Sequence, residues 1–154
     1  MSLLNSLPIA ALVAFTAFAP TAFAARTEDY SSQSVANVGS YADAKALAYK
    51  GQYAEARDML KGITTAEPAN ADAWNMLGYS NRKMGDLKAA SRAYSKALKI
   101  NPDHLGALEY QGEMFIQTGD AERARANLVK LQGLCGNCEE LEDLQKAMTA
   151  AGIS

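Results

Sequence analysis

The sequence predicts an all-α protein in which three helical hairpins stack into a solenoid and one further helix caps the C-terminal end. Similar residues recur every 34 positions between about residues 37 and 138, a period typical of stacked repeats. Within each copy, apolar residues follow the three-and-four spacing of amphipathic helices. No stretch shows the strict alternation that indicates a strand. Together these patterns favour stacked hairpins over a single globular core.

The composition and charge of the chain limit the classes of function that it can have. The chain has 154 residues, of which 49% are hydrophobic and 21% charged, and its formal net charge is −2. This balance is typical of a folded globular protein. No stretch supplies the basic face that a nucleic-acid-binding protein needs, so nucleic acid is excluded as the expected partner.

The N-terminal segment has the pattern of a secretory signal peptide. Residues 1–25 carry no charged side chain, and the apolar run Leu7–Ala19 is followed by Pro20 and the small-residue pattern Ala22–Ala24. We predict cleavage after residue 24, and therefore an exported, periplasmic protein without stable membrane insertion after cleavage. The alternative is an uncleaved membrane anchor, although the apolar run is short for a bilayer span. Residues 25–36 are polar and are expected to form a flexible leader.

Three copies of the repeat follow, at residues 37–70, 71–104 and 105–138. The positions that recur in register are the glycines Gly51, Gly85 and Gly119, the alanines Ala56, Ala90 and Ala124, the prolines Pro68 and Pro102, and the small residues Ala44, Gly78 and Gly112. Each glycine is expected to end the first helix of its copy, because glycine readily adopts the left-handed conformation found there.

The middle copy resembles the tetratricopeptide repeat. The residues that carry this resemblance are Trp74, Leu77, Gly78, Ala90, Tyr94, Ala97 and Pro102. The first copy lacks the tryptophan, and the third has Gly136 where the proline belongs. The small residues are expected where two helices approach closely, and Tyr94 and Trp74 are expected to fill the space between neighbouring copies.

Residues 139–154 predict the C-terminal capping helix. Leu141, Leu144, Ala147 and Met148 share one side of this helix, and its acidic residues lie mostly elsewhere on the circumference. An apolar side toward the stack and a polar side toward water is what a terminal cap requires.

Both cysteines, Cys135 and Cys138, fall in the turn before the cap. Asn137 is expected to cap the final helix, with Glu140 at its third position and Cys138 in the first turn. The leading interpretation is a short disulfide that joins the last repeat to the cap, consistent with an oxidising compartment. A redox-active pair and a pair of reduced thiols are the alternatives.

No metal site or cofactor is expected. A closed zinc site needs four ligands, and the one histidine, His104, lies a full period before Cys138. His104 is instead expected at the surface or in a turn. With no nucleophile and acid arranged around it, a catalytic triad is not indicated.

In the family that the middle copy resembles, the first helix of each pair lines a concave groove that holds extended peptides or partner helices. The resemblance implies that the groove of this chain is lined by Tyr41, Lys45, Tyr49, Asn75, Tyr79, Arg82, Glu109, Tyr110 and Glu113. Tyrosines on such a wall are typical of recognition surfaces, although packing within the solenoid is an alternative role for each. The groove is expected to be basic toward the first two copies and acidic at the third. Glu109 and Glu113 are interpreted as solvated helix charges rather than a catalytic pair.

These observations favour a non-enzymatic adaptor or scaffold of the cell envelope that binds a protein or peptide. The alternative is a thiol-disulfide helper that acts through Cys135 and Cys138. Homo-oligomerisation is left open, as is a place in a larger envelope assembly.

Overall fold

The computed structural model describes residues 39–153, and these residues form helices without any strand. The elements are α2 (Tyr41–Tyr49), α3 (Tyr53–Ala66), α4 (Ala71–Lys83), α5 (Leu87–Ile100), α6 (Leu105–Gln117), α7 (Ala121–Cys135) and α8 (Glu139–Ala150). The predicted all-α class is confirmed. The predicted signal peptide at residues 1–24 and leader at residues 25–36 lie outside the described residues.

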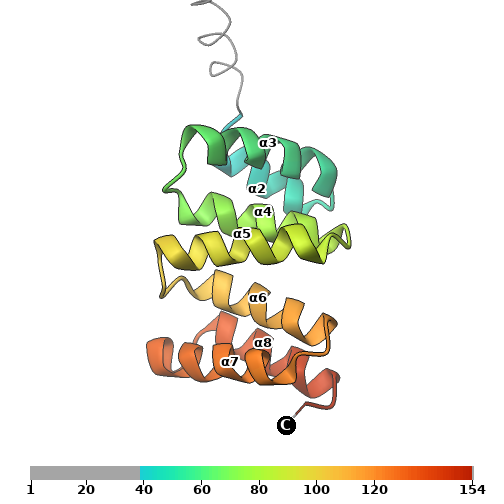
Figure 1. Cartoon of the computed structure of the whole chain (residues 1–154), viewed down its shortest axis with the longest axis vertical. Helices are drawn as coiled ribbons and strands as arrows, with labels where there is room; N and C mark the ends of the chain where they lie inside the picture. Colours follow the sequence, from blue (N-terminus) through green and yellow to red (C-terminus); the bar gives the residue numbers. More distant parts are fainter. Residues whose placement is uncertain (1–38, 154) are drawn as a thin grey trace, which may run out of the picture.

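The helices stack in chain order. Figure 1 shows the pairs α2–α3, α4–α5 and α6–α7 following one another from the top of the stack to the bottom, with α8 beside α7 at the end. Each helix packs against the next one in the chain, and α8 packs against both α6 and α7. The predicted solenoid of helical hairpins with a capping helix is therefore the observed architecture.

The turns within the hairpins follow from glycine and from side-chain caps. Gly51, Gly85 and Gly119 have φ values of +83°, +83° and +76°, a left-handed conformation that residues with a Cβ adopt only at a cost. Asp86 then begins α5, since its carboxylate accepts a hydrogen bond from the Ala89 amide at 2.9 Å. The 34-residue spacing of the glycines thus places a sharp turn at the same point of each hairpin.

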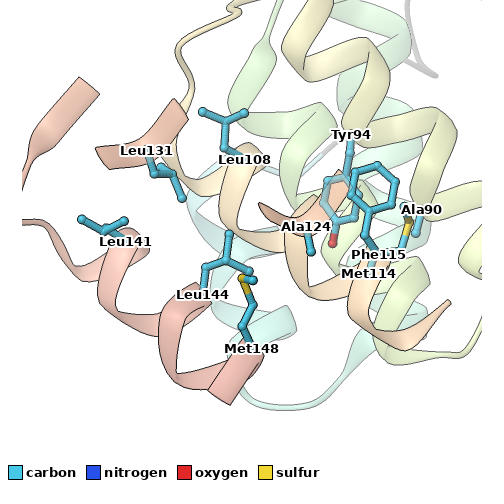
Figure 2. Close-up of a cluster of buried hydrophobic side chains, with 10 residues drawn as sticks. All are labelled: Ala90, Tyr94, Leu108, Met114, Phe115, Ala124, Leu131, Leu141, Leu144 and Met148. Carbon is cyan, nitrogen blue, oxygen red and sulfur yellow. The ribbon is translucent and has the colours of Figure 1, made fainter. Parts of the chain in front are cut away.

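Two apolar clusters form the core. The upper cluster joins α2, α3, α4 and Ala93 of α5, and Trp74 packs against it. The lower cluster, drawn in Figure 2, is formed by Ala90, Tyr94, Leu108, Met114, Phe115, Ala124, Leu131, Leu141, Leu144 and Met148. Tyr94 of the second hairpin packs with residues of the third, and Trp74 packs with residues of the first, so both aromatic residues lie between copies as predicted. The apolar side of α8 also faces the stack.

Helix pairs meet at glycine where a larger residue does not fit. A Cβ at Gly78 would lie 2.5 Å from the ring of Tyr94, which is fully buried. A Cβ at Gly112 would lie 2.7 Å from the Leu144 methyl carbons. The first contact brings α4 against α5, and the second brings α6 against the capping helix.

None of the helices in residues 39–153 combines the length and the apolar character that a membrane crossing requires.

Replacing Gly78 with alanine is expected to lower the free energy of unfolding by about 1–3 kcal/mol, because the buried Tyr94 ring must move to admit the methyl group. The matched control is Gly133→Ala in α7, where a Cβ would meet nothing within 4 Å. That change is expected to raise the free energy of unfolding by about 0.5–1 kcal/mol through helix propensity. Urea denaturation, monitored by circular dichroism, measures the free energy of unfolding of both variants. Equal effects of the two substitutions would contradict the close contact.

Candidate functional site

The predicted groove residues come together along α2, α4 and α6. Six of them line one cavity of about 330 Å³: Tyr41, Lys45, Tyr49, Asn75, Glu109 and Tyr110. The other three, Tyr79, Arg82 and Glu113, adjoin it through contacts with these residues and with one another. The cavity therefore crosses the first helices of all three hairpins.

Tyr79 is the centre of a cluster of aromatic rings. Its ring centroid lies 5.9 Å from that of Tyr49, 4.9 Å from that of Tyr110 and 6.1 Å from that of Tyr53. Edge-on and tilted pairs at these distances are favourable arrangements for aromatic rings. Tyr49 nevertheless leaves 56% of its surface exposed. The cluster is thus held by its own packing and still leaves the Tyr49 ring accessible to solvent.

Arg82 lies beneath this cluster and does not extend freely into the groove. Its side chain is buried, with its guanidinium carbon 5.7 Å from the ring centroids of both Tyr79 and Tyr110. It forms an ion pair with Glu113 of α6, and its Nε donates to the Tyr94 hydroxyl at 3.4 Å. Burying a charge is tolerated when it is paired in this way. The expectation of a basic wall in the second copy is therefore wrong for Arg82, whose charge Glu113 neutralises.

The interpretation of Glu109 and Glu113 as solvated charges is also wrong. Glu109 is only 7% exposed, because α8 covers this face of α6. Burial, reinforced by the negative charges of Glu113, Asp143 and Glu140, raises the pKa of Glu109 to about 8. Glu113 is partly buried and engaged with Arg82. Within residues 39–153, no hydrogen bond or ion pair holds the carboxylate of Glu109.

The sequence interpretation missed the contribution of the capping helix to this cavity. Glu139, Glu140 and Asp143 of α8 line it, together with Asp72 of α4. The signal was present, since Asp143 lies three positions after Glu140 and four after Glu139, and residues at these spacings lie next to each other on a helix surface. It was not used because the acidic side of a terminal helix was expected to face only water.

His104 has a structural role at the start of α6. Its Nδ1 accepts a hydrogen bond from the Ala107 amide at 3.2 Å, and its Nε2 lies 3.0 Å from Asp72 Oδ1. This arrangement corresponds to the tautomer with the proton on Nε2. The predicted turn position is correct, although the side chain borders the cavity and is mostly buried.

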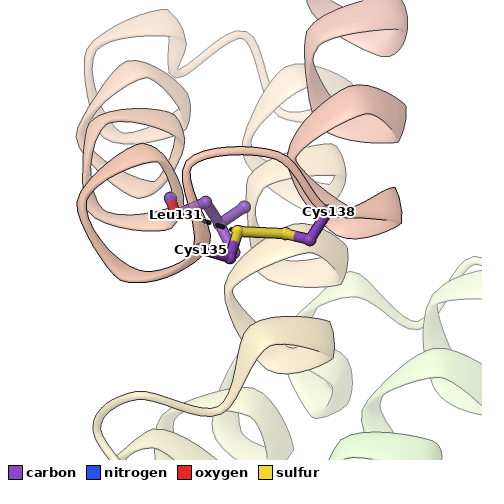
Figure 3. Close-up of a disulfide and its surroundings, with 3 residues drawn as sticks. All are labelled: Leu131, Cys135 and Cys138. Carbon is purple, nitrogen blue, oxygen red and sulfur yellow. Dashed lines mark hydrogen bonds between the residues drawn. A yellow bond between two sulfur atoms is a disulfide. The ribbon is translucent and has the colours of Figure 1, made fainter.

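The structure joins Cys135 and Cys138 in a disulfide at the turn between α7 and α8, drawn in Figure 3. Cys135 Sγ also lies 3.1 Å from the Leu131 carbonyl oxygen. The expected capping by Asn137 is wrong, because Cys138 itself is the N-cap residue in an extended conformation, and its side chain makes no capping hydrogen bond. The bridge holds Cys138 outside the helix, and Glu139 becomes the first helical residue.

A larger cavity of about 570 Å³ lies among α3, α4 and α5. Its lining includes Arg57, Lys61, Arg92 and Lys96 around Trp74. Only Trp74 of these lies on a first helix of a hairpin, and the cavity shares no residue with the groove. Although it is larger, this cavity is not lined, among the described residues, by any buried side-chain atom that lacks a hydrogen-bond partner, whereas the groove cavity contains Oδ1 of Asn75. We therefore take the groove cavity as the candidate site. Across residues 39–153 no group of three or more His, Cys, Asp or Glu side chains is arranged to hold a metal ion.

Comparison with known proteins supports the repeat assignment. The tetratricopeptide repeat family matches residues 71–104, the copy that resembled it most clearly. No curated protein matches the chain significantly in sequence.

Several solved structures share the fold. The Yersinia enterocolitica type III secretion translocator chaperone SycD, in a form described as an alternative dimer, is 19% identical, with 80% of this chain and 92% of that chain covered and a TM-score of 0.64. SycD in complex with a peptide of the translocator YopD is 18% identical, with coverage of 81% and 91% and a TM-score of 0.62. PcrH in complex with the chaperone-binding region of PopD is 18% identical, with coverage of 82% and 91% and a TM-score of 0.62. At these identities the likeness establishes the fold.

The raised pKa of Glu109 predicts a stability cost that grows with pH. The unfolded carboxyl ionises near 4.5 and the folded one near 8, so the folded state favours the protonated form. The free energy of unfolding should therefore fall as pH rises between these values. Glu109→Gln removes the charge and keeps the shape of the side chain. Its free energy of unfolding should equal that of the native protein at about pH 4 and exceed it by about 2–3 kcal/mol at about pH 9. The expected difference is smaller than the full linkage value because Glu109 lines a surface cavity, where solvent screens part of its charge.

Urea denaturation of both proteins across this pH range measures the difference. Glu142→Gln, on the exposed side of α8, is the control and should show no comparable rise with pH. If the free energies of unfolding of Glu109→Gln and the native protein differed by the same amount at every pH, the raised pKa of Glu109 would be contradicted.

Proposed function

We propose that this protein is a non-enzymatic adaptor that holds an extended segment of a partner protein in the groove along α2, α4 and α6. The observation that carries the proposal is the aromatic cluster around Tyr79 at the edge of a polar cavity. Exposed tyrosines provide a large contact area with a polar tip and lose little conformational entropy on binding. A peptide backbone could find both apolar contact and hydrogen-bond partners there.

The comparisons add support from proteins of the same fold. SycD and PcrH are described in complexes with segments of YopD and PopD, respectively. A helical solenoid of this size is thus able to bind a segment of another protein. Because a shared fold does not fix function, the groove of this chain has to be tested directly. Self-association is part of the proposal, and the exposed Val129 and Leu134 of α7 offer apolar surface for it.

We further propose that the protein works in an oxidising compartment after export, in a bacterial periplasm. The signal-peptide pattern of residues 1–24 and the pairing of Cys135 with Cys138 both support this location. Disulfides persist in such compartments and are rare in reducing ones. In this setting the bridge serves as a structural link at the turn before α8.

Tyr79→Ala is expected to weaken peptide binding by about tenfold or more, since truncating a central interface aromatic typically costs over 1 kcal/mol. Peptides are first selected from a random displayed library of extended segments against the purified protein, and affinities are then measured by fluorescence anisotropy. Tyr79→Phe should bind like the native protein because it keeps the ring contacts. Lys99→Ala, at an exposed position on α5, is the control outside the groove. Failure to select any peptide, or equal binding by Tyr79→Ala, would reject the proposal.

Replacing both Cys135 and Cys138 with serine separates an adaptor from a thiol-disulfide helper. An adaptor should keep its affinity for the selected peptides and lose about 2 kcal/mol of stability, as expected for so short a loop. Anisotropy and thermal unfolding give these two values. If the native protein instead exchanges disulfides with a model substrate and the serine variant does not, the protein is a thiol-disulfide helper and the adaptor proposal is rejected.

A further inference from the structure

The groove cavity carries an excess of negative charge that the protein does not compensate. Five carboxylates line it: Asp72, Glu109, Glu139, Glu140 and Asp143. Only Lys45 and His104 oppose them in the lining, and His104 is already bonded to Asp72. Lys146 pairs with Asp143 at 2.9 Å and also attracts Glu139. Arg82 attracts Glu109 at longer range. Within residues 39–153 no direct ion pair holds the carboxylates of Glu109, Glu139 and Glu140.

Two acceptors of this cavity have no donor within residues 39–153, and one of them, Oδ1 of Asn75, is also fully shielded from solvent. Asn75 is 5% exposed, and its Oδ1 has no hydrogen-bond partner. Glu109 is 7% exposed and has neither a hydrogen bond nor an ion pair within residues 39–153. Buried polar groups in folded proteins are normally paired, and each acceptor left alone carries an unrecovered desolvation cost. Both residues belong to the lining, so a ligand that brings donors into the cavity would satisfy both.

On this basis we infer that the cavity between α4, α6 and α8 binds a lysine or arginine side chain of the partner segment. This inference rests on the proposed function and specifies which peptides the groove selects. Ammonium and guanidinium groups supply three to five donors and no acceptor, which matches a lining rich in acceptors. A cavity of about 330 Å³ accommodates one such long side chain, and its apolar stem can lie against Tyr110 and Tyr49.

Other occupants fit the cavity less well. An acidic or phosphorylated segment would place its charge against the carboxylates at short range, which is unfavourable in a partly buried site. A divalent cation would need several oxygen ligands at one point, and the described residues hold no such cluster. The aromatic cluster beside the cavity would contact the apolar part of the same segment, so the basic side chain would fix the position of the segment along the groove.

The test couples single basic residues of the selected peptides to two carboxylates of the cavity, Glu109 and Glu140. In each peptide the lysine and arginine residues are replaced singly by methionine, which keeps length and removes charge. The protein variants are Glu109→Gln combined with Glu140→Gln, and the matched control Glu142→Gln. Glu140 and Glu142 both lie in the first turn of α8, but only Glu140 lines the cavity, so the two changes alter the helix dipole alike. Circular dichroism confirms that each variant is folded.

We expect the selected peptides to contain a lysine or arginine whose replacement lowers affinity about tenfold for the native protein and for Glu142→Gln. The same replacement should change affinity less than about twofold for the Glu109→Gln, Glu140→Gln variant, since charged groups in contact are strongly coupled. Selected peptides without a basic residue, or an equal effect in all proteins, would overturn the inference. In that case binding that still depends on Tyr79 would leave the proposed function standing.

Calcium chloride alone is titrated as a second probe. Calcium binding that the Glu109→Gln, Glu140→Gln variant loses, together with peptide binding that is indifferent to basic residues, would assign the cavity to a cation instead. If no peptide is selected at all, the groove function and this inference both fail.

Discussion

The contact between Gly78 and the ring of Tyr94 is the constraint on which the groove depends. Because position 78 has no Cβ, the tyrosine ring packs directly against α4 in a fully buried position. Its hydroxyl group then receives a hydrogen bond from Arg82 Nε. Arg82 is thereby held under Tyr79 and Tyr110 and paired with Glu113. A packing requirement between α4 and α5 therefore determines where the aromatic residues of the groove lie.

The capping helix does more than cover an apolar end. Leu144 packs on Gly112 in the space that a Cβ would occupy, which brings α8 directly against α6. This position buries Glu109 and places the acidic first turn of α8 over the same cavity. The burial raises the pKa of Glu109 and costs stability at neutral pH. Strongly shifted pKa values cluster at sites that bind or react, which supports the proposal that this cavity is the functional site.

The sequence predicted features that depend on short spacings within one helix or between copies. The glycine turns, the hairpins and the small residue at Gly78 all follow from the 34-residue period. The residues of the first helices could be placed along one groove for the same reason. What could not be predicted was which neighbour covers each side chain. The surroundings of Glu109 depend on the docking angle of α8, and the pairing of Glu113 depends on Arg82, 31 positions earlier. The predicted N-cap at Asn137 was wrong because Cys138, held in the disulfide, is the N-cap residue instead.

The disulfide and the acidic cavity are connected through the start of α8. Cys138 is the N-cap residue, and Glu139 and Glu140 follow it immediately. A bridge that spans two intervening residues constrains the unfolded chain very little, so its entropic effect on overall stability is small, about 2 kcal/mol. The bridge also links the end of α7 to the residue directly before the acidic first turn of α8. Leu144 and Met148 lie further along α8 and would keep their apolar contacts after reduction, whereas the first turn, which includes Leu141, would lose its covalent link to α7. Under the proposed function, the bridge connects the oxidising environment to the end of α8 that borders the groove cavity.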